Sequence, residues 1–176
     1  MSPTEKVPIE EVPELHGAQH DRISERQVDQ DRTLEAMQRL EAALGAAAPG
    51  REGRWRDEVR GALAVLGTTT AQEATNAAAP DSLLSDVART QPWLRNRVRG
   101  LRIQYRQLQE AIASLQGELN ESEGTVDFAD IRQRLAWVLT GLRHQRARES
   151  DLIYEAYYDA FRRDLPREAD EELRGE

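Results

Sequence analysis

The stretch that decides the fold is LRNRVRGLRIQYRQLQEAIASLQGEL, residues 94–119. Eight of its residues form a series in alternating steps of four and three: Leu94, Val98, Leu101, Tyr105, Leu108, Ile112, Leu115 and Leu119. This spacing places them along one face of an α-helix. The seam therefore predicts a long helix that begins near Pro92, buries one side and needs other helices to cover that side.

Similar but weaker patterns predict three more long helices. They are expected over residues 13–48, 55–78 and 127–165. A Gly/Pro linker separates the first two, Pro80-Asp81-Ser82 breaks the chain after the second, and Asp127 is a good N-cap for the last. No alternating strand pattern occurs. Four long helices with short connections predict an all-α, up-down antiparallel four-helix bundle over residues 14–165.

The rest of the chain and its composition exclude several classes of protein. Residues 1–13 contain three prolines and are expected to form an extended arm, and residues 166–176 an acidic tail. No apolar run is long enough for a membrane span or a signal peptide, so we expect a cytoplasmic protein. The absence of cysteine excludes disulfides and thiolate metal sites. A net charge of -8 with 5% aromatic residues argues against nucleic-acid and membrane partners.

The apolar seams contain polar side chains near their middles. These are His16 and His20 beside Ile23, Thr69 and Glu73 beside Leu66, Tyr105, and finally Gln145 and Glu149. At about 100° per residue, Gln145 lies about 40° from Glu149 and His144 about 140° from it, so Gln145 is expected to face the core. A carboxylate buried alone costs several kcal/mol, so Glu73 and Glu149 need partners. Those partners could be a metal, a protonated histidine, hydroxyl and amide donors, or arginines at the bundle edge.

Four phrases in these helices resemble the hemerythrin-like (HHE cation-binding) domain family. They are AQHDR at 18–22, LAVLGTTTAQEATNAAAP at 63–80, LRIQYRQL at 101–108 and LRHQRARESDLIYEAY at 142–157. The resemblance implies non-haem irons inside the bundle, held by histidines and bridging carboxylates. His20 matches the family's first-helix ligand and Glu73 its second-helix carboxylate. Thr69 and Tyr105 stand where the family has histidines.

In the last helix, the family resemblance and helix geometry point to different residues. His144 and Glu149 have the five-residue spacing of the family's histidine and acid, although helix geometry turns Gln145 inward instead. His16, one turn before His20, is a further candidate ligand. A di-iron site in a bundle usually needs about six protein ligands, which this chain does not clearly supply. The resemblance therefore predicts an altered iron site, mononuclear or dinuclear.

Three functions follow as alternatives. The first is an altered non-haem iron protein that performs redox or oxygen chemistry on a small molecule, as an oxidase or oxygenase would. In this interpretation His20, Glu73 and Glu149 hold the metal, and Tyr105 or His144 completes or tunes the site. The second is a scaffold without iron that binds a small molecule, or a metal-independent biosynthetic enzyme with His20 and a protonated glutamate as acid and base. In both, Thr69 and Gln145 would line the pocket. The third is a non-catalytic interaction bundle. The chain would be a monomer or a homodimer.

Overall fold

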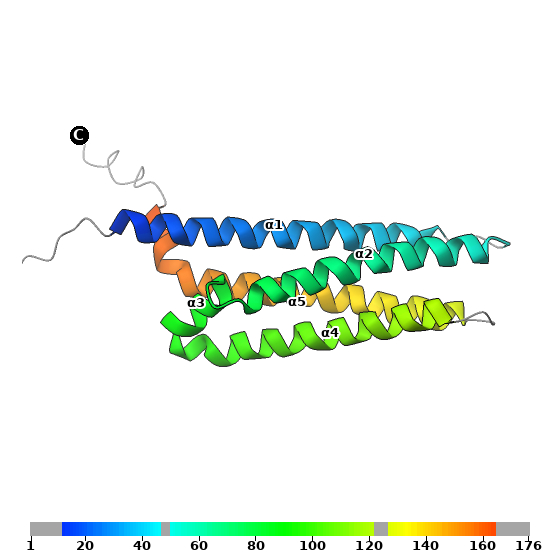
Figure 1. The fold of residues 1–176 in the computed structure, drawn as a ribbon. Coiled ribbons are helices and arrows are strands. Elements are labelled where there is room, and N and C mark those ends of the chain that lie inside the picture. The colour runs from blue at the N-terminus through cyan, green and yellow to red at the C-terminus, as the bar shows by residue number, and fades with distance from the viewer. Residues whose placement is uncertain (1–11, 47–49, 122–126, 165–176) are drawn as a thin grey trace, which may run out of the picture.

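The computed structural model describes residues 12–46, 50–121 and 127–164, with side chains over 17–46, 50–121 and 127–158 (Figure 1). Its helices are α1 (Val12–Gly45), α2 (Glu52–Ala78), α3 (Leu83–Thr90), the 3-10 turn η2 (Pro92–Leu94), α4 (Arg95–Glu121) and α5 (Phe128–Asp164). No strand occurs within the described ranges. The predicted all-α class with four long helices is confirmed.

The helix ends follow from local sequence. Ser82 is the N-cap of α3, where its hydroxyl accepts a hydrogen bond from the Ser85 amide at 3.2 Å. Asp127 precedes α5 and accepts from the amides of Ala129 and Asp130 at 3.0 and 3.2 Å. At the other end of the chain, helix α1 already includes the last two residues of the predicted arm. The rest of the arm and the whole predicted tail lie outside the described residues.

The long helices lie side by side, with α1 packed on α2, α2 on α4 and α4 on α5, while the short α3 packs on α4 near one end (Figure 1). Every residue of the seam over 94–119 is buried. The buried apolar residues form two clusters, one containing Leu40, Leu66 and Leu135, the other containing Leu84 and Leu152. The two clusters fill opposite parts of the helices, and together they supply the apolar burial that stabilises the fold.

A layer of buried polar side chains separates these two clusters. On α1, α2 and α5 the sequence passes from one cluster to the other through polar positions: Arg26 and Thr33, Thr70 and Glu73, Gln145 and Glu149.

None of the described helices is long and apolar enough to cross a membrane.

Two glycines allow close contact with α4. A Cβ atom on Gly141 of α5 would lie 2.7 Å from a methyl carbon of Leu108, and one on Gly67 of α2 would lie 2.6 Å from the side-chain nitrogen of Gln116. Real Cβ atoms do not approach neighbours this closely, so a larger residue at either position would displace its neighbour. The Gln116 side chain is flexible and can move, whereas Leu108 is buried, so the absence of a side chain matters most at Gly141.

Candidate functional site

An arginine occupies the centre of the buried polar layer. Arg26 of α1 is only 6% exposed. Its Nε and Nη2 atoms donate to the two carboxylate oxygens of Glu149 on α5. Nη2 also lies 2.9 Å from Oε1 of Glu73 on α2 and donates to the hydroxyl of Tyr105 on α4. One guanidinium therefore contacts side chains from the three other long helices.

Two hydroxyl groups complete the arrangement. The Tyr105 oxygen lies 2.8 Å from an oxygen of Glu73 and 2.8 Å from an oxygen of Glu149, within hydrogen-bond distance of both. Thr33, two turns after Arg26 on α1, donates to the second oxygen of Glu73. We call these five residues, Arg26, Thr33, Glu73, Tyr105 and Glu149, the core network. It joins all four long helices through charge-assisted hydrogen bonds.

The electrostatics of the core network keep Arg26 charged and Tyr105 neutral. Burial by itself would lower the pKa of Arg26, but the hydrogen bond and charge of Glu149, with the nearby Tyr105 and Glu73, raise it above its usual range. Burial, followed by the charges of Glu149 and Glu73, raises the pKa of Tyr105 well above its ordinary value. The network therefore contains a permanent cation and a hydroxyl donor facing two carboxylates.

Three of the predicted site residues come together here. Glu73 is 3% exposed, Tyr105 4% and Glu149 0%, and all three lie within one network, at the level where the seams were expected to meet. Their predicted catalytic and metal-binding roles stay predictions. The partner of the two carboxylates is an arginine in the centre of the bundle, where the sequence interpretation had placed arginines only at its edge.

The position of Gln145 is also as expected from helix geometry. Its side chain is 1% exposed, and its amide nitrogen donates to the Leu101 carbonyl at 3.1 Å, while its Oε1 is buried without a partner. His144 beside it is exposed. His16 lies within α1, but its side chain is outside the described residues.

Two predicted positions need correction. His20 was expected on the inward face of α1, but it is exposed, because it lies six residues before the buried Arg26 and so points about 120° away from it. Thr69 is only partly buried, and its hydroxyl donates to the Leu66 carbonyl at 3.1 Å. The neighbouring Thr70, at 1% exposed, faces the core in its place.

These positions do not fit the iron centre that the sequence predicted. His20 and His144 are exposed, whereas Glu73 and Glu149 are buried and directed at a guanidinium. Within the described part of the chain, no three His, Cys, Asp or Glu residues lie close enough together to hold a metal ion. Carboxylate oxygens that already bind Arg26 would have to release it before they could bind a metal.

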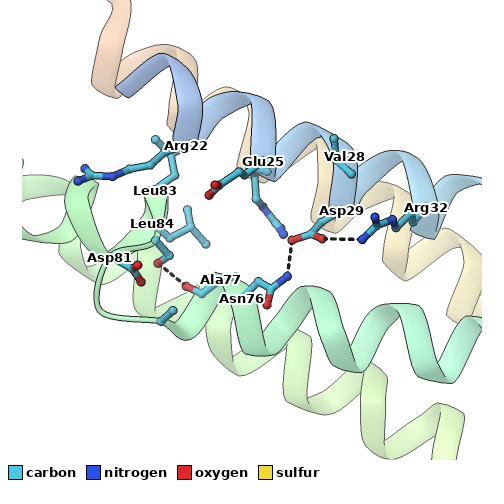
Figure 2. Close-up of a pocket in the computed structure, with 13 residues that line it drawn as sticks. Arg22, Glu25, Val28, Asp29, Arg32, Asn76, Ala77, Asp81, Leu83 and Leu84 are labelled. Carbon is cyan, nitrogen blue, oxygen red and sulfur yellow. Dashed lines mark hydrogen bonds and ion pairs between the residues drawn. The ribbon is translucent and has the colours of Figure 1, made fainter. Parts of the chain in front are cut away.

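A cleft of about 420 Å³ lies between α1 and the turn that joins α2 to α3 (Figure 2). Arg26 lines this cleft, and its third nitrogen, Nη1, is buried without a hydrogen-bond partner. Val28, Leu83 and Leu84 form apolar parts of the wall. At one side Asn76 donates to Asp29 at 2.8 Å, which closes the contact between α1 and α2.

A third buried carboxylate, that of Asp86, contacts Arg22, which lines this cleft. Asp86 of α3 is 5% exposed, lies 2.5 Å from a nitrogen of Arg89 and 3.5 Å from one of Arg22, and accepts from the Tyr157 hydroxyl at 2.9 Å. Burial and the hydrogen bond to Asp86 raise the pKa of Tyr157. This cluster attaches α3 to α1 and α5, so it is a structural contact that the sequence interpretation did not find.

Arg26 is the main residue that sequence reasoning missed, although a signal for it exists. Arg26 lies seven residues before Thr33 and fourteen before Leu40, so it shares one face of α1 with them. Thr33 and Leu40 are both buried, which indicates that Arg26 is buried too. Two glutamates on inward faces also call for a nearby cation.

Comparison of the chain with protein-family models, with curated proteins and with solved structures gives no match.

Proposed function

We propose that this protein is a metal-free helical bundle that binds a small molecule, with Arg26 in the position that a metal ion holds in hemerythrin-like domains. The up-down antiparallel topology and the relationship to that family are parts of this proposal. The support is chemical. A guanidinium supplies the positive charge that two buried carboxylates need, and its planar fork matches a carboxylate in two parallel hydrogen bonds.

The observation on which the binding function rests is the free Nη1 atom of Arg26. Two of the three guanidinium nitrogens bind the core network, whereas Nη1 is buried without a partner in a side chain that lines the cleft. An unsatisfied buried donor costs about 1–3 kcal/mol, and more when it is charged. A ligand oxygen that enters through the cleft would remove this cost. Because Nη1 is itself buried, binding includes a small movement of the cleft wall.

The cleft also indicates what kind of molecule fits. Arg26 requires a hydrogen-bond acceptor, and Val28, which is 48% exposed, provides apolar contact for the rest of the ligand, with Leu83 and Leu84 buried in the wall. A small molecule with a carbonyl oxygen at one end and an apolar body meets both requirements. The exposed His20 is not part of the network, so the acid–base pair of His20 with a buried glutamate has no support in this geometry.

A pair of valine variants tests this function. Val28 lines the cleft and is 48% exposed, whereas Val65 of α2 is 38% exposed and does not line it. With benzamide as the probe, ligand-observed NMR should detect binding to the full chain, with Kd raised at least about tenfold by Val28→Trp and unchanged by Val65→Trp. Equal binding by both variants, or no binding by the unchanged chain, would contradict the proposal.

A further inference from the structure

A separate groove of about 700 Å³ lies between α2 and α4. One side is formed by small residues of α2 and the turn after it, namely Ala74, Thr75, Ala78 and Ala79. The other side is formed by Arg102, Tyr105, Arg106 and Gln109 of α4. The small side chains leave the backbone of α2 open to close approach by a flat molecule. Arg26 does not line this groove, which shares only Ala79 with the lining of the cleft.

The charge of this groove is opposite to that of the whole protein. The chain has 32 acidic and 24 basic residues, yet the groove lining contains two arginines and no carboxylate. Arg102 and Arg106 are one helical turn apart on the same face of α4, where like charges repel each other. An anion placed between them would relieve this repulsion, whereas a cation would increase it.

The two arginines have free donors for such an anion. Arg102 is held in place by a hydrogen bond from Nη2 to the Ser85 hydroxyl at 2.8 Å, while its Nε is buried with no partner. Arg106 is exposed, and within the described residues it has no hydrogen-bond or ion-pair partner. An anchored guanidinium loses little side-chain entropy on binding, and its planar donors match a carboxylate or phosphate group.

We propose that the groove between α2 and α4 binds a small organic anion, a carboxylate or a phosphate monoester, with its charged group between Arg102 and Arg106. Its flat apolar part lies on Ala74 and Ala78. Gln109, whose amide nitrogen is 3.4 Å from the Thr70 carbonyl, is a weakly engaged donor beside the same site. This inference does not depend on the proposed function, since the anion would contact Arg102 and Arg106, and neither of them lines the cleft beside Arg26.

Calorimetric titration of the full chain with benzoate and with phenyl phosphate tests this site. Arg106→Gln is the main variant, because Arg106 is exposed and has no hydrogen bond or ion pair with any residue that the structure describes. Arg99→Gln is the matched control, since Arg99 is an exposed arginine of the same helix that does not line the groove. Loss of one charge-assisted contact should raise Kd about tenfold in Arg106→Gln and leave it within about twofold in Arg99→Gln.

Each outcome decides the proposal. Tighter binding of benzoate would assign carboxylates as the ligand class, and tighter binding of phenyl phosphate would assign monoesters. Arg102→Gln should weaken the same probe, and circular dichroism would show whether loss of the Ser85 contact has changed the fold. No binding of either probe would overturn the proposed site. An equal loss of affinity in Arg99→Gln and Arg106→Gln would also overturn it, because that result would mean a diffuse attraction to surface charge.

Discussion

Arg26 and Glu149 are 123 residues apart in the chain and form a bidentate ion pair, in which Nε of Arg26 contacts Oε1 of Glu149 and Nη2 lies 2.5 Å from Oε2. This pair joins the first long helix to the last. Glu73 and Tyr105 extend it to α2 and α4, so two buried carboxylates and one neutral hydroxyl, from three helices, meet a cation that the fourth helix supplies.

Removing the cation should destabilise the protein strongly. Arg26→Met leaves the buried Glu73 and Glu149 without their cation, with only the hydroxyls of Thr33 and Tyr105 as partners. Breaking a buried ion pair in this way costs about 3–5 kcal/mol. Urea denaturation should show this loss in the free energy of unfolding. Replacing the charges together, in Arg26→Met with Glu73→Gln and Glu149→Gln, should recover most of it. An unchanged free energy of unfolding in Arg26→Met would mean that Arg26 does not form a buried ion pair with Glu73 and Glu149.

Shortening the same side chain should create a cation site. In Arg26→Ala the oxygens of Thr33, Glu73, Tyr105 and Glu149 would surround the space left by the guanidinium, and oxygen ligands of this kind suit Mn²⁺. Addition of Mn²⁺ should raise the thermal midpoint of Arg26→Ala by several degrees and leave that of the unchanged chain where it was. The double variant with Glu149→Gln should lose the response. A response that survives in the double variant would place the ion elsewhere.

The buried tyrosines predict a specific loss of stability at alkaline pH. The pKa values of Tyr105 and Tyr157 are raised on folding, so above about pH 10 the unfolded chain releases protons that the folded chain retains. The free energy of unfolding should therefore be independent of these groups below about pH 9. It should fall above pH 10 by up to about 1.4 kcal/mol per pH unit for each tyrosine. Tyr105→Phe should make the fall less steep, and an unchanged slope would contradict the assignment.

The close approach of α5 to α4 predicts opposite effects for two glycine substitutions. Gly141→Ala would bring a methyl group within 2.7 Å of the buried Leu108 side chain, and such overpacking costs about 1–3 kcal/mol. Gly100→Ala on α4 meets no atom within 4 Å, so it should gain up to about 1 kcal/mol from helix propensity alone. Thermal denaturation of the two variants measures the difference. Stabilisation by both would show that the helices are not in contact at Gly141.

The helices could be predicted because their signals are local. The alternating spacing over residues 94–119 depends only on neighbouring turns, and Ser82 and Asp127 cap the helices that follow them. The meeting of Glu73, Tyr105 and Glu149 was predictable for a related reason, since each lies on the apolar face of its own helix. Helix phase also placed Gln145 inside and His144 outside, as the structure has them.

The identity of the cation could not be predicted in this way. An arginine on a helix is usually solvated, and Arg26 is buried only because Glu73 and Glu149, 47 and 123 residues away, approach it in the folded chain. His20 was assigned to the core because it shares a stripe with Ile23, which is itself only partly buried. Asp86 was missed since its partners come from α1, α3 and α5, and no periodic pattern records such contacts.

The metal content of the unchanged chain shows directly whether Arg26 stands in place of a metal ion. The chain would be expressed without a histidine tag in iron-supplemented medium, and its metals measured by elemental mass spectrometry. Because Arg26 already supplies the cation for Glu73 and Glu149, we expect less than about 0.2 metal ion per chain. About one or more iron per chain, lost in Glu73→Gln and in Glu149→Gln, would contradict it.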